Sequence, residues 1–467
     1  MTPALRHILP ACLAAGLWSC AGAPEAPDLA IAKTTPATYP SAGARTANAL
    51  TTPWWTRSPP RALAAATETA FDAAPDIAVA AARFDAARAR KAEAEAARWF
   101  DVVVSGRASA SEDSDGDVDE TLRGAVDATL PLDISGRLRA LRNAAAADVA
   151  VAAADFDAAR LALAQNIALQ AAEAGETAEL DALIAAQIEV SETLLRLTEL
   201  RFAQGQASIV DVLQQRNQLA SLAEQRPSLA ARRRAALNAI SALTGANLDS
   251  LDTRSAFLTT PEINNDFAIG APEDLLDTRP DLRSAKAALD AADARYGAAL
   301  RDRLPSLSFT GSAVASAVSG SPQELVSATA STALTVFDTG AKRAAVQRRR
   351  AELEEAGAAY VRDWLAAVAG VDSLIAEERQ TTDAIALSDE RLATARRLLE
   401  AAQRRYRQGA SDFLPVLDAV QSVQQQERAN LSLRADLART RINLHTALGL
   451  TEAPGRSPTD PTQGYDT

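Results

Sequence analysis

Apolar residues recur at three- and four-residue spacing over two long stretches of the chain. The first stretch runs from Arg137 to about Arg201, contains no proline and has one glycine, Gly175. The second stretch, Ala341 to Arg405, repeats the pattern. This period is that of an amphipathic α-helix. About 65 residues at ~1.5 Å each predict helices roughly 95 Å long, and their alanine-rich faces favour coiled-coil packing.

Four shorter stretches alternate with a period of two. They are Phe100–Ala110, Leu122–Leu130, Leu307–Ala315 and Val326–Val336, and in each of them apolar residues face Ser, Thr or charged residues at the alternate positions. Alternation over about ten residues is typical of strands with one lipid-facing and one wet face. A sheet that is half buried on a soluble core would give the same pattern, so both interpretations are open at this point.

The sequence contains an internal repeat with two copies. Gly205 in RFAQGQASIVDVL and Gly409 in RYRQGASDFLPVL are 204 positions apart, whereas Pro75 and Pro280 are 205 positions apart. This self-similarity predicts a tandem duplication of a unit of roughly 190 residues. Insertions are tolerated best in surface loops, so we expect the one-residue difference in the loop of a hairpin.

The duplication divides the chain as follows. The first repeat is expected at 61–250, with a helix, a β-hairpin at 99–132 and a long helical hairpin whose tip is near residue 205. A linker at 251–271 leads to the second repeat at 272–450, with its β-hairpin at 305–337 and its helical tip near residue 409.

Each copy of the quoted motif has the residues of a turn between two helices. Gly205 and Gly409 suit the C′ position, where the backbone takes a positive φ. Three residues later stand Ser208 and Asp412, which are both N-cap types. Asp211 and Pro415 then fall in the first turn of the next helix. The motif is a plain turn on one interpretation and a tip that docks a partner on the other.

The N-terminus is expected to be a targeting signal. Residues 1–19 have a short basic region and an apolar stretch typical of a secretory signal peptide. The sequence Leu-Trp-Ser-Cys ending at Cys20 resembles a bacterial lipobox, which predicts an acylated Cys20, for example with palmitate. Ala21 follows Cys20 in place of an aspartate, which in lipoproteins of this kind implies an outer-membrane location. An ordinary signal peptide with an incidental cysteine is the alternative. Residues 20–60 are expected to be extended, and 451–467 to be disordered.

Composition and charge exclude several classes of function. The 467 residues carry a net charge of −12, which argues against nucleic acid as a partner. Two Cys and two His argue against a metal site. His445 has no companions that suggest a catalytic triad, so we expect no enzyme, catalytic residue or cofactor. The acidic stretch 111–120 has Gly116 in the wrong place for an EF-hand and favours a solvated loop over a calcium site.

Four strands are too few to enclose a pore. Membrane barrels begin at eight strands, and an open sheet edge is not viable in lipid. If the strands lie in a membrane, several chains must share one barrel, and each chain must contribute two hairpins.

The chain resembles the TolC-like outer membrane factor family, particularly its NodT-like lipoprotein branch in efflux systems. The resemblance covers about 54–450 and rests on the order and spacing of four stretches, which are PWW at 53–55, residues 275–312 with Arg279-Pro280-Asp281, residues 405–423, and the ALG that ends at Gly449. It implies a mainly α fold with a β-barrel portion: a homotrimer in which four strands per chain share one outer-membrane barrel, and duplicated coiled-coil helices form a periplasmic α-barrel.

The family resemblance also implies partners and site residues. The duct is expected to dock onto a periplasmic adaptor and an inner-membrane transporter and to pass substrates without chemical change. The adaptor-docking tips carry over to Gly205, Ser208, Gly409 and Asp412, and the periplasmic gate to Asp418 and Tyr406. Three symmetry-related Asp418 carboxylates would focus negative potential at that entrance. An exposed helix acid is the other interpretation of Asp418, and Pro415, Ala410 and Ser411 depart from the gate pattern of the family.

Two further functions remain open. A lipid-anchored periplasmic coiled-coil scaffold would need the long helices but not the alternating strands. The exit duct of a type I secretion system would need both, and the lipobox favours efflux over it. The exported substrate is chosen largely by a separate chain.

Overall fold

The computed structural model describes residues 38–41, 54–57, 61–112, 118–245, 257–263, 269–318, 321–335 and 337–449. The expected signal peptide, Cys20, the tail 451–467 and most of the segment 20–60 lie outside these residues, as does the centre of the acidic loop, 113–117. Of the helices that the structure describes, none is long and apolar enough to cross a membrane.

Helices and strands alternate in the same order in both halves of the chain. The first half contains α3 (Trp54–Arg57), α4 (Arg61–Ala73), α5 (Pro75–Ala96), β1 (Asp101–Glu112), β2 (Val118–Leu132), α6 (Arg137–Ala203) and α7 (Ile209–Thr244). The second half contains the 3₁₀ helix η3 (Pro272–Asp274), α9 (Leu275–Thr278), α10 (Pro280–Arg301), β3 (Ser306–Val318), β4 (Ser321–Ala333), α11 (Ala341–Arg407) and α12 (Leu414–Ala447). The two long helices predicted from the apolar period are confirmed, since α6 and α11 have 67 residues each.

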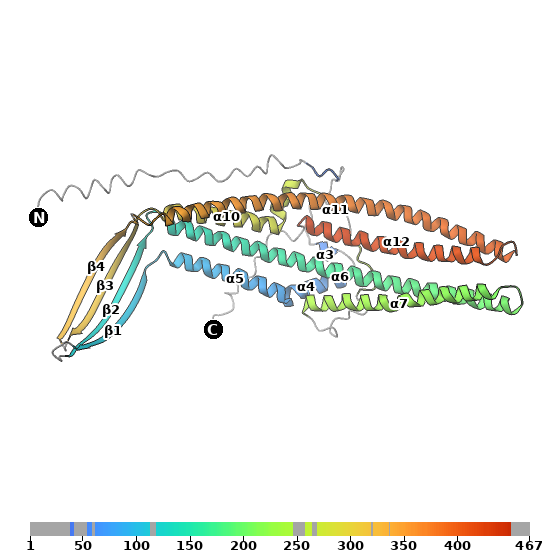
Figure 1. The fold of residues 1–467 in the computed structure, drawn as a ribbon, viewed down its shortest axis with the longest axis horizontal. Coiled ribbons are helices and arrows are strands. Elements are labelled where there is room, and N and C mark those ends of the chain that lie inside the picture. The colour runs from blue at the N-terminus through green and yellow to red at the C-terminus, as the bar shows by residue number, and fades with distance from the viewer. Residues whose placement is uncertain are drawn as a thin grey trace. The chain divides into compact units, whose positions relative to one another are not determined.

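The described residues fall into two compact units, and each unit contains parts of both sequence copies. The first unit includes Ala87–Ala150 and Lys286–Tyr360, and thus all four strands. The second includes Val151–Ala285 and the chain from Val361 onward, and thus α7, α12 and the larger parts of α6 and α11 (Figure 1). The sequence copies are therefore interleaved within each unit.

The strands form one antiparallel sheet in the order β1-β2-β3-β4 (Figure 1). The register aligns the four apolar sets that the sequence predicted. Val104 lies opposite Val126, Val126 opposite Ala313, and Ala313 opposite Val326, so these residues share one face. The Ser and Thr positions share the other face, where the Thr129 and Thr310 hydroxyls are 3.3 Å apart.

The fourth strand begins and ends earlier than the sequence predicted, at Ser321 and Ala333. The alternation suggested a strand to Val336, but β4 ends at Ala333, opposite Ser306. Pro305 precedes Ser306 and has no N–H to donate, so the ladder stops there.

The strand registers locate the one-residue difference between the repeats. Gly106 lies opposite Gly124, and Gly311 lies opposite Ala328. Gly311 follows Gly106 by 205 positions, whereas Ala328 follows Gly124 by 204. The offset therefore changes between the two strands of a hairpin, which confirms the predicted loop position.

Matching turns lead from the sheet into the two long helices. The Asp133 carboxylate accepts hydrogen bonds from the backbone N–H groups of Leu138 and Arg139, at 3.0 and 2.8 Å. The Asp338 carboxylate does the same for Gly340 and Lys342, at 2.9 and 2.8 Å. These backbone hydrogen bonds, that from Lys342 foremost, lower the pKa of Asp338. Each helix thus begins on a carboxylate that is favoured by the helix dipole.

The core of the second unit is built largely from alanine. Ala164, Ala168, Ala171 and Ala172 of α6 are fully buried, among a cluster that also includes Leu63, Ile167, Ile240 and Phe257. Small side chains let helix backbones approach closely, as in coiled coils. Trp54 stacks on His445 at 5.7 Å, so the short helix α3 packs against α12.

Candidate functional site at the helical hairpin tips

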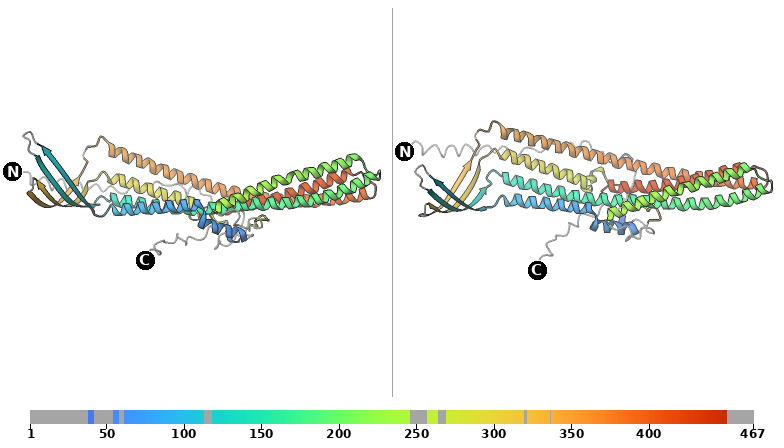
Figure 2. Two further views of the ribbon diagram at one scale, coloured as in Figure 1. Left: turned by 90° about the horizontal axis from the view of Figure 1, so that it is seen from below. Right: turned by 60° about the horizontal axis from the view of Figure 1, so that its bottom comes forward.

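The two helical hairpins end in the same turn. Gly205 and Gly409 have φ angles of 71° and 69°, the left-handed region that favours glycine. The next residue in each turn bonds back five positions, Gln206 N to Arg201 O at 2.8 Å and Ala410 N to Arg405 O at 2.9 Å. This 6→1 bond is that of the Schellman motif. Figure 2 shows both tips together, and they are adjacent in each of its views.

The helices that follow the tips begin differently. Ser208 is the N-cap of α7, and its hydroxyl accepts a hydrogen bond from Val210 N at 3.1 Å. The Asp211 carboxylate accepts a hydrogen bond from the backbone N–H of Ser208 at 2.9 Å, which completes a capping box. The N-cap predicted at Ser208 is therefore confirmed.

The equivalent prediction for Asp412 is wrong. The N-cap of α12 is Phe413, in helical backbone conformation and without a side-chain cap. Pro415 is the second residue of that helix and has no N–H, so a carboxylate at the cap has one donor fewer to bind. Phe413 is buried instead, in a cluster with Val416, Leu417 and Ala402.

Tyr406 joins the two tips. Its ring lies 5.5 Å from that of Phe413, centroid to centroid, and the Arg201 guanidinium stands 4.3 Å over its face. Arg201 belongs to α6, whereas Tyr406 belongs to α11 and Phe413 is the N-cap of α12. A cation over an aromatic face is attracted by the ring quadrupole, so this contact couples the hairpins. Sequence analysis did not find Arg201, although it aligns with Arg405 in the repeat.

Asp418 lies on the exposed side of α12, between the buried residues Leu417 and Ala419. Within the described chain, no hydrogen bond or ion pair engages its carboxylate, and the structure records no contact between Asp418 and Tyr406. Gly205, Ser208, Gly409 and Asp412 are exposed as well. Apolar residues are exposed around them, namely Phe202, Ile209, Val210, Leu213 and Leu414.

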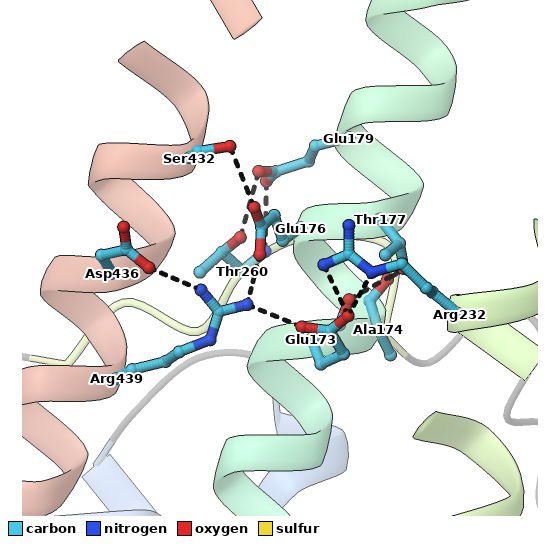
Figure 3. A network of polar contacts seen from close by, with 10 residues as sticks. All are labelled: Glu173, Ala174, Glu176, Thr177, Glu179, Arg232, Thr260, Ser432, Asp436 and Arg439. Atoms are coloured by element: carbon cyan, nitrogen blue, oxygen red, sulfur yellow. Dashed lines mark hydrogen bonds and ion pairs between the residues drawn. The ribbon is translucent and has the colours of Figure 1, made fainter. Parts of the chain in front are cut away.

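A network of charges lies between α6, α7 and α12 (Figure 3). Arg439 of α12 pairs with Glu176, with Glu173 at 2.8 Å and with Asp436 at 2.9 Å. Arg232 of α7 pairs with Glu173 from the other side at 2.7 Å. Burial lowers the pKa of Arg439, but the hydrogen bond to Glu176 and the negative charges of its three acidic partners together leave that pKa raised.

Glu176 is 5% exposed, so its charge depends on these partners. It accepts one further hydrogen bond, from the Ser432 hydroxyl 3.0 Å away.

The segment 257–263, between the repeats, is held beside this network by hydrogen bonds and by buried side chains. Thr260 donates from its N–H and its hydroxyl to the Glu179 carboxylate, at 3.1 Å each. Phe257 and Ile263 are buried. Gly175 admits the segment, because a Cβ there would stand 2.4 Å from the carbonyl of Thr259.

Comparison with known proteins shows which family has this sequence and fold. The family model described as outer membrane efflux protein matches residues 67–246 and again 271–450. The pyoverdine export outer membrane protein OpmQ of Pseudomonas putida is 29% identical over 353 residues, which are 73% of this chain and 72% of that protein. Nodulation protein T of Rhizobium leguminosarum bv. viciae is 26% identical over 326 residues, 68% of this chain and 67% of its own.

A solved structure gives the same fold. The outer-membrane channel OprN superposes with a TM-score of 0.82 at 24% identity, over 89% of this chain and 96% of that one. The mainly helical fold with a small antiparallel sheet, predicted above, is therefore confirmed. Because the family model matches most of the chain, the protein belongs to the outer membrane efflux protein family and is an outer membrane efflux channel with a periplasmic extension.

Proposed function

We propose that the chain is the exit duct of a tripartite efflux system, in which three copies conduct substrates passively from the periplasm to the outside. The observation that carries the proposal is the sheet, whose outer strands β1 and β4 each have one edge without a partner among the described residues. Its apolar face is also uncovered, with Val104 at 76% and Val326 at 83% exposure. Lipid can cover that face, but only further strands can pair the edges.

The hairpin tips are the proposed docking surface for the periplasmic adaptor, which in turn meets an inner-membrane transporter. Gly205, Ser208, Gly409 and Asp412 lie there, and the exposed apolar residues around them suit a partner helix. The gate at the periplasmic entrance is assigned to Asp418 and Tyr406. Asp418 supports this role because its carboxylate is exposed and unpaired within the described chain, so three copies would focus negative potential on the axis.

Acylated Cys20 is the proposed lipid anchor, on the lipobox alone, since it lies outside the described residues. The protein acts as a duct and not as an enzyme. A pore-free scaffold is the second candidate, and the long helices taken without the sheet would favour it.

The native mass of the detergent-solubilised protein tests the assembly. We expect a particle near three times the 49.0 kDa chain, less its signal peptides, that resists sodium dodecyl sulfate until it is heated. A stable monomer would mean that the sheet does not form a pore wall, and the scaffold would then be the better account.

Single-channel recording tests the gate. We expect Asp418→Ala to weaken the block by divalent cations added on the periplasmic side. Glu400→Gln is a matched control, because Glu400 is an exposed helix acid with its side chain 68% accessible. An unchanged block in the Asp418 variant would remove Asp418 from the gate while leaving the duct in place.

A further inference from the structure

Two arginines lie directly opposite each other on the polar face of the sheet. Arg107 of β1 pairs with Arg123 of β2, and the same row continues through Ser316 of β3 to Gln323 of β4. Both arginines are exposed. Residues that face each other across antiparallel strands point to the same side, so this row places two guanidinium groups at one level.

This pair of arginines destabilises the four-stranded sheet of a single chain. Like charges directly opposite on antiparallel strands are destabilising. In the described part of the chain no ion pair relieves them. Asp127 occupies the same face of β2, but it is four residues from Arg123, roughly 13 Å along a strand. Repeat symmetry does not require the pair, because the equivalent residues of the second hairpin, Ser312 and Ser327, lie opposite each other and are uncharged.

We propose that Arg107 and Arg123 form a ring of guanidinium groups in the lumen that attracts and binds small oxyanions, carboxylates foremost. The inference rests on the proposed function, since three copies sharing one barrel bring six of these groups to one level. Each guanidinium presents a fork of donors that matches a carboxylate. Rings of basic side chains select anions in other pores.

The apolar face supports this orientation of the sheet. On the other face of the same two strands, Ala108 pairs with Leu122, which is 64% exposed, and Val104 pairs with Val126. That face can meet lipid only if the arginine face is turned to the lumen. Ser316 and Gln323 then extend the row of hydrogen-bonding groups around the wall.

Reversal potentials across a planar bilayer, in a gradient of KCl, measure the selectivity. The comparison is made in an Asp418→Asn background, so that the proposed gate does not mask the lumen. Six charges about 10 Å from the axis, screened with a Debye length of about 10 Å in 0.1 M salt, shift the anion-to-cation permeability ratio by on the order of tenfold. We expect the double variant Arg107→Gln and Arg123→Gln to lose that shift.

Two variants control the measurement. Arg107→Lys with Arg123→Lys keeps the charges and should keep the selectivity. Glu324→Gln changes a charge on the opposite face of the same sheet and should leave it unchanged. Citrate should reduce the current of the wild-type lumen and of the Lys variant, and should have little effect on the Gln variant.

The outcomes separate this inference from the proposed function. If no variant forms a channel, the duct itself is refuted. If channels form and the Gln variant keeps both the permeability ratio and the citrate block, the ring is refuted and the duct stands. A Glu324→Gln effect as large as that of the double variant would also overturn the ring, because the sheet face would then be wrongly assigned.

Discussion

Replacement of Gly175 by alanine should loosen the segment that joins the two repeats. A Cβ at this position would stand 2.4 Å from the carbonyl carbon and oxygen of Thr259 and 2.5 Å from Thr260 N. All three are backbone atoms, so no side-chain rotation relieves the overlap, and the segment 257–263 must move away from α6.

The cost follows from what the segment buries. Phe257 is 1% exposed and Ile263 is 3% exposed. Exposing two such side chains costs roughly 3–6 kcal/mol, and each lost Thr260–Glu179 hydrogen bond about 0.5–1.5 kcal/mol. Alanine regains about 1 kcal/mol of helix propensity. Because the segment can relax in part, we expect a net loss of about 2–5 kcal/mol.

Gly370 supplies the matched control. It lies inside α11, is exposed, and a Cβ there would meet nothing within 4 Å. Gly370→Ala should therefore stabilise the protein by about 0.5–1 kcal/mol. The thermal midpoint of the oligomer and the rate of proteolysis between residues 246 and 263 are measured for both variants. Equal midpoints and equal cleavage rates would refute the close packing at Gly175.

Three further predictions concern single side chains. Ser208→Ala should cost about 1 kcal/mol and speed amide exchange in the first turn of α7, whereas Asp412→Ala should leave the first turn of α12 unchanged, because only Ser208 is a cap. Arg439→Met should lower the free energy of unfolding by about 3–5 kcal/mol in thermal or denaturant unfolding, because it removes the charge partner of the buried Glu176 carboxylate. Glu176→Gln in the same chain should recover much of that loss. The hydrogen bond from Arg226 lowers the pKa of Asp181 below the ordinary 3.8. The stability that this ion pair contributes to the folded state is therefore present above pH 3.8 and is lost as the pH falls through the lowered pKa. Asp181→Asn should flatten the acid limb of a stability–pH curve.

Local periodicity is what the sequence revealed best. The 3.6-residue period gave α6 and α11, and the two-residue period gave the apolar face of the sheet, because both patterns follow from contacts that each element makes along its own length. The tip glycines were identified for a similar reason. The backbone of Gly205 and Gly409 has to take a positive φ to end the helix, and glycine does so without strain.

Contacts between distant segments stayed hidden. Arg201 meets Tyr406 across more than 200 residues, and Glu176 meets Arg439 across 263. A charged residue on a long helix looks the same in sequence whether it is solvated or paired in the core. The alignment of Asp412 with Ser208 misled for a different reason, because the neighbouring Pro415 and Phe413 changed what the turn needed.

The repeat therefore preserves the backbone of the tip and changes what stabilises it. In the first copy Ser208 and Asp211 hold the turn by hydrogen bonds to their own backbone, and that turn is complete in itself. In the second copy Phe413 packs on Tyr406, which in turn lies under Arg201 of the first hairpin. The second tip is thus held mainly by apolar packing within its own hairpin and also receives the Arg201 contact from the first, whereas the first tip has a hydrogen-bonded cap. A movement of α11 and α12 away from α6 would break the Arg201–Tyr406 contact while leaving the capping box intact.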